Sequence, residues 1–405
     1  MGCERGCREV AETALEKLEG EKPKFFLLFS TIHYEKYGGF QELLNGVWEV
    51  LPEGTPLIGG TVAGFMSMDG VFSRGVSSVA ISGKLDAVPA LSRGTRKNPQ
   101  KVALEVARQL IGKHLILTFM PGPSMPITGK GERIIVSRSK YSSRLAPQLL
   151  KISTTKFNKG VGREMEVLDK LAEAVKSDII GGSTIDDNRY HENYQFFQNS
   201  IFTDALVSIG LRGINYKLAT VETMPMPEKW YKVTKKGAFG HVVQKIENID
   251  AIDIYIRELG YDRDIIFEEP NLVHRRFVFV PAVTKDQYGN YHPRCPGAFH
   301  GGSLGFGHPV FDLIGFSTTN GRYILNSFIN FFKSFQKETK FLLSFCCAVL
   351  FEALGKSTYI LWDKIREVYD KDYMMLFSGG EFFSPKENYK GARILEMSLT
   401  GVSLW

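Results

Sequence analysis

Hydrophobic and polar positions along the chain form blocks that follow one another in the same order. Short apolar runs typical of strands begin at Lys24 (KFFLLFST), His114 (HLILTFMP) and Lys340 (KFLLSFCC). Each is followed by a segment with apolar residues three and four apart, which is typical of a helix with one buried face. These segments are FQELLNGVWEVL from Phe40, EMEVLDKLAEAV from Glu164 and YILWDKIREVY from Tyr359. The pattern predicts layered α and β structure.

Each predicted helix is followed by a pair of glycines and then by a further apolar strand. The pairs are Gly59 with Gly60, Gly181 with Gly182, and Gly379 with Gly380. Glycine tolerates a positive φ and a close approach to its backbone, so such pairs mark turns, bulges or ligand contacts. We expect a turn between two strands at each pair. The recurrence predicts an internal repeat and supports ligand binding only weakly.

The predicted fold class is mixed α/β, of the α+β kind, with three related helix-strand-helix-strand-strand units packed in layers. Two units fall within residues 1–220, which form the first predicted domain. The second predicted domain, residues 221–405, begins with a β-rich segment and ends with the third unit. Residues 122–163 interrupt the second unit where a strand-to-helix loop is expected, and loops accept insertions at little thermodynamic cost.

The composition is that of a folded globular chain, with 43% hydrophobic and 23% charged residues. The longest uncharged apolar stretch, Phe341 to Phe351, is shorter than the roughly 18 to 20 residues that a membrane span needs. The first residues contain no apolar signal region. Five cysteines, two of them adjacent, give no disulfide framework. We therefore expect a cytoplasmic protein without a membrane partner.

Positive charge is concentrated in the insertion. Residues 129–163 contain nine Lys or Arg against one acid, Glu132. A basic loop of this kind can meet an anionic partner, or it can be a solvated, mobile insertion. Nucleic acid is not the expected partner, because no aromatic platform or nucleic-acid fold signature accompanies the charge.

Several segments together resemble the FIST family, named for F-box and intracellular signal transduction proteins. The matching segments are PLIGGTVAGF, IIGGSTIDD, YKVTKKG, IDAIDIYIRELG, FLLSFCC and LFSGGEFFSP. Residues 24 to about 220 are similar to the amino-terminal FIST domain and residues 225–400 to the carboxy-terminal one. The resemblance implies a sensory module that binds a small molecule, with amino acids as the usual proposal, while some relatives resemble haem-based sensors. Relatives place an arginine shortly after the FLLSFCC strand, where this chain has Val349 and Leu350.

The candidate ligand-binding residues lie at and beside the glycine pairs. Backbone N–H groups there can meet an anionic group, hydroxyls can donate, and paired carboxylates can hold an ammonium group or a cation. Arg74 corresponds to Asp204 in the second unit, and it is expected to pair with an acid or with a ligand carboxylate. The full set is Gly59, Gly60, Thr61, Arg74, Gly181, Gly182, Ser183, Asp186, Asp187, Gly379, Gly380 and Glu381.

A second group could bind a metal ion or haem iron. The segment YHPRCPGAFHGGSLGFGH contains His292, Cys295, His300 and His308. Imidazole and thiolate are suitable ligands, but the spacing matches no paired CxxC pattern. We therefore predict no metal and no cofactor, and keep haem as an alternative.

The sequence favours a binding protein over an enzyme. It contains no nucleophile elbow and no GxGxxG after a strand, although a triad assembled from distant positions stays open. We predict a cytoplasmic sensory, signal-transduction protein that binds an amino acid or another small metabolite and passes the signal to a protein partner. The alternatives are a recruiting scaffold without a small ligand, and a haem or metal sensor.

Overall fold

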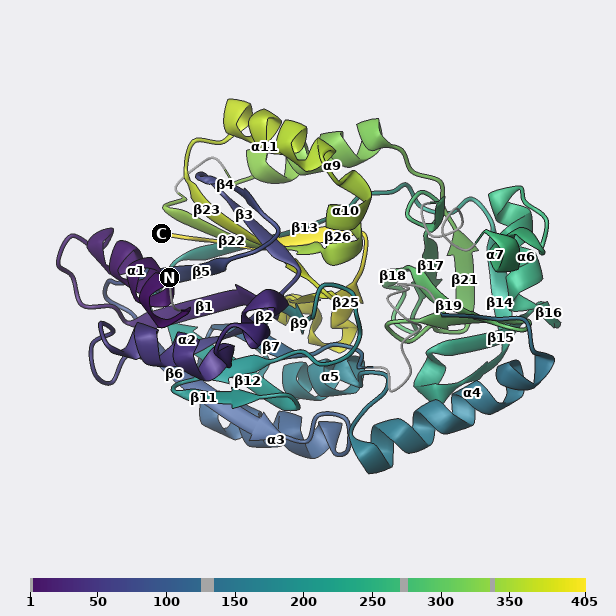
Figure 1. Cartoon of the computed structure of the whole chain (residues 1–405), viewed down its shortest axis with the longest axis horizontal. Helices are drawn as coiled ribbons and strands as arrows, with labels where there is room; N and C mark the ends of the chain where they lie inside the picture. Colours follow the sequence, from purple (N-terminus) through teal and green to yellow (C-terminus); the bar gives the residue numbers. More distant parts are fainter. Residues whose placement is uncertain (1–2, 125–134, 270–275, 336–338) are drawn as a thin grey trace.

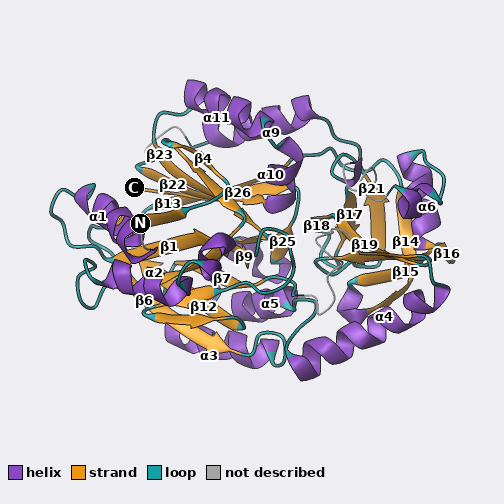
Figure 2. Cartoon of the chain, viewed as in Figure 1, coloured by secondary structure: helices purple, strands orange, loops and turns teal. Residues whose placement is uncertain are grey.

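The computed structural model describes residues 3–124, 135–269, 276–335 and 339–405 and shows two lobes (Figure 1). Helices and strands both contribute heavily to the described chain (Figure 2), so the predicted mixed α/β class is confirmed. The larger lobe contains three sheets of five, six and six strands, and the smaller lobe contains one large sheet.

The three sheets of the larger lobe share one arrangement. In each, a central strand pairs in parallel with the strand that follows the helix and antiparallel with the last strand of the unit. The strands are β1 (Phe25–Thr31) with β2 (Leu57–Val62) and β5 (Val76–Ile81), β7 (Leu115–Pro121) with β9 (Asp178–Thr184) and β12 (Ala205–Arg212), and β22 (Phe341–Cys347) with β23 (Asp372–Ser378) and β26 (Ser398–Leu404). The internal sequence repeat itself stays a prediction.

Each of these sheets also receives a hairpin from another unit. The second unit's hairpin joins β2, the third unit's joins β9, and the first unit's joins β23, so the exchange is cyclic. The hairpins are β10 (Gln195–Phe197) with β11 (Ser200–Phe202), β24 (Glu381–Ser384) with β25 (Arg393–Leu395), and β3 (Gly64–Ser67) with β4 (Gly70–Phe72). One apolar core between the sheets contains side chains from all three units. The proposed division at residue 220 stays a prediction, although strands from both sides of it share sheets.

Amphipathic helices cover the outer faces of the three sheets. The helix α5, for example, buries Val167, Leu168 and Leu171, which lie on one side at helical spacing. The covering helices are α1 (Cys3–Glu16), α2 (Gly39–Trp48), α3 (Pro99–Leu110), α5 (Glu164–Val175), α9 (Gly321–Lys333), α10 (Ala348–Leu354) and α11 (Ser357–Val368).

The smaller lobe is built mainly from the chain between β13 (Tyr216–Glu222) and α9. Its strands are β14 (Trp230–Gly237), β15 (Val242–Ile246), β16 (Ile249–Asp250), β17 (Ala282–Lys285), β18 (Tyr291–Arg294), β19 (Pro296–His300), β20 (Ser303–Phe306) and β21 (Leu313–Phe316). The helices α6 (Ala251–Leu259) and α7 (Ile265–Glu268) lie beside this sheet (Figure 1).

The basic insertion contributes a strand and a helix to the smaller lobe. β8 (Ile135–Ser137) pairs in parallel with β19, and α4 (Lys140–Ile152) runs along the lower edge in Figure 1. The expectation of a loop is therefore wrong for the described residues 135–163. Tyr141, Leu145 and Leu149 recur at the four-residue spacing typical of a helix, and all three side chains are more than half exposed. The other residues of the predicted insertion, 125–134, lie outside the described residues.

The expected turn is present at only one of the three glycine pairs. Gly59 and Gly181 lie inside β2 and β9, and a Cβ there would come within 1.7 and 1.8 Å of a backbone oxygen on the parallel partner strand. The close approach of two strands, and no turn, requires glycine at these positions. By strand register the corresponding residue of the third sheet is Met375, and Gly379 lies beyond it, at a bend between β23 and β24.

Candidate functional site

A cavity of about 540 Å³ lies where the smaller lobe and α4 face the ends of β9 and β23. Its size falls within the roughly 300 to 1,000 Å³ usual for small-molecule sites. Part of the lining is apolar and includes Leu145 and Leu149 of α4 together with Val242, Phe277 and Phe306. The cavity therefore offers apolar surface as well as polar groups.

The polar part of the cavity lining rests on three buried side chains. Glu396, just before β26, lines the cavity, and its Oε1 lies 2.7 Å from Nδ1 of His308. Its other oxygen accepts a hydrogen bond of 2.7 Å from the backbone N–H of Cys295. Nε2 of His308 lies 3.6 Å from Oε1 of Glu164, the first residue of α5. One imidazole is thus held between two carboxyl groups.

The electrostatics of this centre favour the charged imidazole. Burial acts to lower the pKa of His308, but the nearby carboxyl group of Glu164 and the hydrogen-bonded carboxyl group of Glu396 raise it to about 9. Burial likewise acts to raise the pKa of Glu164, and the nearby His308 ring, 3.6 Å away, brings it below its usual value. His308 is therefore an imidazolium at neutral pH. Because two carboxyl groups share it, the polar side of the cavity accepts hydrogen bonds more readily than it donates them.

A loop after β9 completes the polar side. Nδ2 of Asn188 donates to Oε2 of Glu352 at 3.1 Å, and both residues line the cavity. Asn188 is 4% exposed, and its Oδ1 has no hydrogen-bond partner within the described chain. Arg189 lies at the rim, 44% exposed, with its guanidinium 3.8 Å from the Asp187 carboxylate.

The predicted carboxylate pair has separate structural tasks. The Asp186 carboxylate accepts the backbone N–H groups of Tyr190, His191 and Glu192 at 2.9, 2.6 and 3.0 Å, and so fixes the loop that carries Asn188. Burial raises its pKa. Asp187 turns toward Arg189 instead. The two carboxylates therefore stabilise the loop that carries Asn188 and are not among the residues that line the cavity.

The third glycine pair is the one that reaches the cavity. Gly379 lines it beside Ser378, while an added Cβ on Gly380 would meet the His308 ring. Glu381 is fully buried behind them and accepts the hydroxyl of Ser378 at 3.2 Å. Burial raises its pKa well above the usual range. Burial thus favours the neutral form of the Glu381 carboxyl group, which lies beside Ser378 and Ser398.

Other predicted ligand residues lie at the strands of the larger lobe. Gly59, Gly60 and Thr61 are buried in β2, where the Thr61 hydroxyl accepts the backbone N–H of Tyr194 at 3.0 Å. Gly181, Gly182 and Ser183 are buried in β9; Ser183 comes nearest the centre, with its hydroxyl 3.4 Å from Oε1 of Glu164. None of these six residues is among those lining the cavity in the described structure.

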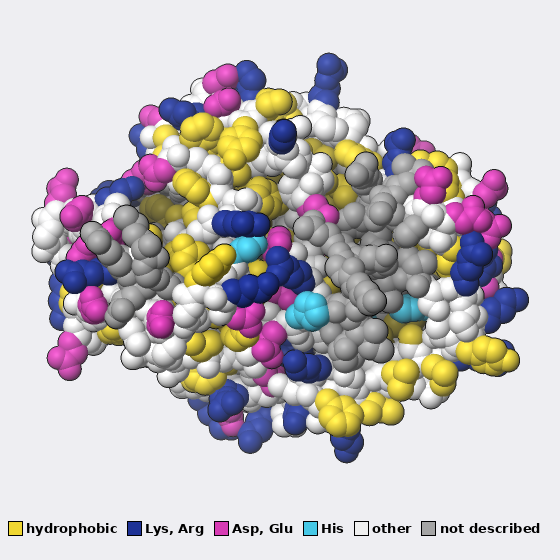
Figure 3. Space-filling model, in the orientation of Figure 1, with side chains coloured by type: hydrophobic (Ala, Val, Ile, Leu, Met, Phe, Trp, Pro, Cys, Tyr) yellow, Lys and Arg dark blue, Asp and Glu magenta, His cyan; other side chains and the backbone are white. Residues whose placement is uncertain are grey.

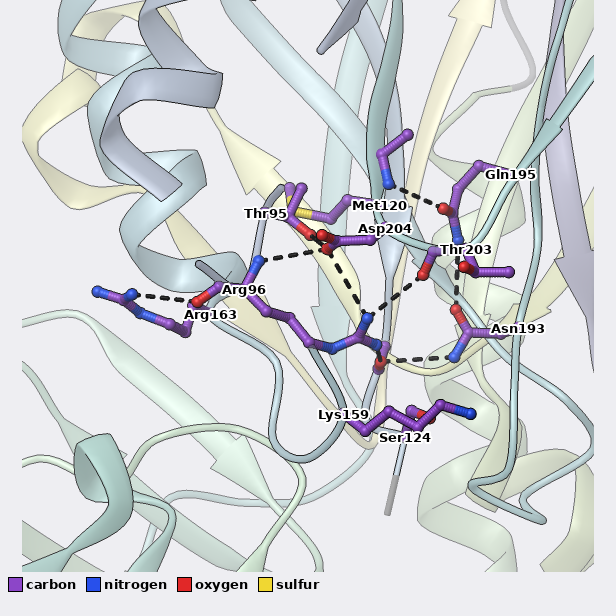
Figure 4. A network of polar contacts seen from close by, with 12 residues as sticks. Thr95, Arg96, Met120, Ser124, Lys159, Arg163, Asn193, Gln195, Thr203 and Asp204 are labelled. Atoms are coloured by element: carbon purple, nitrogen blue, oxygen red, sulfur yellow. Dashed lines mark hydrogen bonds and ion pairs between the residues drawn. The ribbon is translucent and has the colours of Figure 1, made fainter. Parts of the chain in front are cut away.

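Arg74 is exposed on the connection between β4 and β5, and its counterpart Asp204 has a different role. Asp204 accepts the hydroxyl of Thr95 at 2.5 Å and the backbone N–H of Arg96 at 3.3 Å (Figure 4). The Arg96 side chain is buried and donates to the backbone oxygen of Gly122 at 2.7 Å. The network fixes the segment that leads into α3, so Asp204 acts in the fold and lies apart from the cavity.

The four metal candidates do not form one cluster. His292 pairs with Asp286 at 3.1 Å, and burial lowers its pKa to about 4. Cys295 and His300 line the cavity, and burial raises the thiol pKa of Cys295 while lowering the pKa of His300. His308 is held by its carboxyl groups. Within the described residues, no three or more His, Cys, Asp and Glu side chains are placed to hold a metal ion.

Sequence reasoning missed Glu164, Asn188, Glu352 and Glu396. Glu164 and Glu352 lie in helical segments where a charged residue normally faces solvent, and Glu396 follows a short β-like run. Of these four, Asn188 could have been found from the sequence, because it directly follows Asp186 and Asp187, which are predicted ligand-binding residues. Glu164 and Glu396 are buried against His308 of the smaller lobe, and no local sequence pattern indicates that contact.

The fold defines a two-lobed α/β protein with a cavity between the lobes. The FIST N domain model matches residues 24–226, half of the chain, and the chain therefore belongs to the FIST family, whose domains serve sensory signal transduction. The match covers the predicted amino-terminal domain, so the resemblance of residues 225–400 to the carboxy-terminal domain stays a prediction. No curated protein matches the chain. Among the described helices, none has the length and apolar character to cross a bilayer.

Proposed function

We propose that the chain is a sensory protein whose cavity between the lobes binds an amphipathic small molecule. The ligand presents hydrogen-bond donors, such as an amino or ammonium group, to the polar side and lays an apolar body against α4. The observation that carries this proposal is the acceptor-rich part of the lining, where Glu396 and Asn188 border the cavity. The Oδ1 atom of Asn188 has almost no accessible surface and no partner in the described chain, so a ligand donor reaches it after a small shift of the side chain and then recovers about 1–3 kcal/mol.

Amino acids remain within the proposed class, with a constraint on how they bind. Val349 lines the cavity where the family resemblance places an arginine, so it offers no grip for a ligand carboxylate. The cation that lines this cavity from the loop after β9 is Arg189 at the rim. An amino acid would have to extend its carboxylate toward Arg189 while its ammonium group meets Asn188 and Glu396. An apolar amine needs no such span, and we rank it first.

Signal output follows from the position of the cavity. A ligand that touches α4 and the loop of Asn188 connects the two lobes, and its binding free energy can favour one arrangement of them. A partner protein would then read the altered surface. Recruitment without a ligand is the second candidate, because Ile152 at the end of α4 and Phe157 just after it are 51% and 73% exposed and do not line the cavity. Figure 3 shows hydrophobic side chains along the lower right edge, where α4 lies.

The test is thermal unfolding of the purified chain with apolar primary amines, matched carboxylic acids, apolar amino acids and hemin. A ligand at 100 times its Kd adds about 2.7 kcal/mol. With an unfolding entropy of about 2.1 cal/mol/K per residue, the midpoint of a chain of this size should rise by roughly 3 °C. We expect amines to give this rise and matched acids to give none.

The matched variants are Asn188→Leu, which removes the unpaired acceptor, and Asn330→Leu, on the exposed side of α9. The amine response should disappear in the first and persist in the second. A response to acids alone would overturn the donor assignment, and a response to hemin alone would establish the haem alternative. A panel without any response would favour the recruiting scaffold.

A further inference from the structure

Within the described chain, one of the three related sheets has one strand fewer than the other two. In two sheets the last strand of the unit is flanked by a further antiparallel strand: β6 (Asp86–Arg93) pairs with β12, and β13 pairs with β26. In the first sheet β5 is the edge strand, and no strand of the described chain pairs with its outer side. This sheet therefore has five strands where the others have six.

The order of the chain shows which position is open. The strand after the first unit joins the second unit's sheet, and the strand after the second unit joins the third unit's sheet. By the same cyclic rule, a strand that follows β26 would join the first unit's sheet at β5. The outer edge of β5 is thus equivalent to the edges of β12 and β26. The strands that cover those two edges, β6 and β13, indicate what kind of segment would fit at β5.

The edge presents unpaired backbone groups in a regular row. Gly75 and Ile81 accept hydrogen bonds from the β1 side, at Thr31 and Lys24. Because backbone groups alternate in direction along an antiparallel strand, those of Val76, Ser78 and Ala80 point away from β1. Such a row is a template for pairing with another strand.

A groove of about 850 Å³ runs along this edge. One wall is α1, with Val10 and Ala14, and the other includes Phe72 and Met374. Trp405 also lines the groove. Figure 1 shows the C-terminal mark close to α1. Because the edge is recessed between two walls, it admits a single extended segment more readily than the edge of a second copy's sheet.

We propose that the β5 edge is a docking site for an extended segment of a partner protein, which completes the first sheet by antiparallel pairing. The equivalent strands β6 and β13 indicate the length and pattern of this segment. β6 has eight residues and β13 has seven. Each packs apolar side chains, such as Leu91 and Leu218, against the central core. The segment should therefore carry apolar residues at alternate positions. The groove shares no lining residue with the cavity between the lobes, so this proposal stands apart from the ligand assignment.

The experiment supplies the missing strand from the position that the cyclic rule assigns. A short Gly/Ser linker and the sequence YKLATVE, copied from β13, are added after Trp405. The control is the same tail with prolines at its third and fifth positions, which cannot donate to a ladder. A tether gives an effective concentration in the millimolar range for short linkers, so even weak pairing is populated.

Amide hydrogen exchange of residues 76–82 reports the result. We expect at least tenfold slower exchange with the strand-forming tail than with the proline tail, and a higher unfolding midpoint. Equal exchange with both tails would overturn the proposal. Slow exchange of residues 76–82 in a dimer of the untailed chain, detected by light scattering, would assign the edge to a second copy and also overturn it. The variant Ala80→Pro, which removes an outward N–H, should abolish the tail's effect, and the thermal unfolding of the untailed variant checks that it folds.

Discussion

Two buried histidines of this protein have carboxyl partners, yet they differ in charge. His308 lies between Glu164 and Glu396 and has a pKa of about 9. His292 lies 3.1 Å from Asp286, but burial lowers its pKa to about 4. The first is therefore an imidazolium at neutral pH and the second a neutral imidazole.

The difference lies in how many carboxyl groups each ring faces and what else those groups do. Asp286 also accepts the backbone N–H groups of Tyr288 and Asn290 and the side-chain amide of Asn290, so its charge is shared among several donors. Arg294 further disfavours a charge on His292. His308 has two carboxyl groups close by, and their combined attraction exceeds its desolvation. A buried imidazole thus becomes charged where its partners have few other donors.

The largest expected effect comes from removing the charged ring. His308→Gln leaves Glu164 and Glu396 buried without their cation, and breaking such a buried pair costs about 3–5 kcal/mol. His292→Gln is the matched control, because Asp286 keeps its other donors and the loss should be nearer 1 kcal/mol. Urea unfolding followed by circular dichroism measures both. Equal losses would show that the two centres do not differ in the way described.

The opposite pKa shifts predict opposite pH dependences. His308 has a folded pKa above its unfolded value of about 6.5, so its stabilisation is complete below pH 6.5 and is lost as the pH rises through about 9. His292 has a folded pKa below its unfolded value, so folding loses stability as the pH falls from about 6.5 toward about 4. Across each of these two pH ranges, the free energy of unfolding should change by roughly 2–4 kcal/mol.

Unfolding free energies of the wild type, His308→Gln and His292→Gln between pH 4 and pH 10 separate the two contributions. The difference between wild type and His308→Gln should shrink on the alkaline side. The difference between wild type and His292→Gln should change on the acid side. A parallel set of curves would contradict both assignments.

Much of the local structure could be predicted from the sequence, because it depends on periodicity. The apolar runs beginning at Lys24, His114 and Lys340 do become central strands, and the helices after them form. The exchange of hairpins between sheets could not be predicted, since pairing between Glu381 and Gly182 joins residues far apart in the chain. The glycine pairs gave a wrong prediction of turns. Gly59 and Gly181 lie inside strands and Gly379 lies past the end of one, a difference in strand register that the sequence does not show.

The candidate site could be predicted only in part. His308 was selected for its chemistry, but as a metal ligand, because its partners Glu164 and Glu396 are distant in sequence and look like ordinary charged residues. Gly379 was selected and does line the cavity. The apolar wall was missed, since α4 lies in a segment whose charge suggested a solvated loop.

A smaller effect is expected when His308 loses one partner and keeps the other. Glu164→Gln removes the carboxyl group 3.6 Å from Nε2, so the pKa of His308 should fall by about 1–2 units. Glu173→Gln, a change at an exposed position of the same helix, is the control. Imidazole ¹H–¹⁵N correlation spectra across the pH range measure the shift. An unchanged pKa in Glu164→Gln would mean that Glu396 alone holds the charge.

The smallest effect is expected at Asp286, the partner of His292, because its carboxylate mainly accepts hydrogen bonds from the turn at Tyr288 and Asn290. Burial acts to raise the pKa of Asp286, but hydrogen bonds from His292 and Asn290 lower it to about 2. Its stabilisation is therefore present above about pH 3.8 and is lost as the pH falls toward 2. In Asp286→Asn the amide oxygen still accepts the N–H groups of Tyr288 and Asn290, and His292 is already neutral. We expect a loss of about 1 kcal/mol at pH 7 and a weaker dependence on acid below pH 4. A loss as large as that of His308→Gln would show that Asp286 carries a buried ionic interaction after all, and that the number of carboxyl partners does not determine which imidazole is charged.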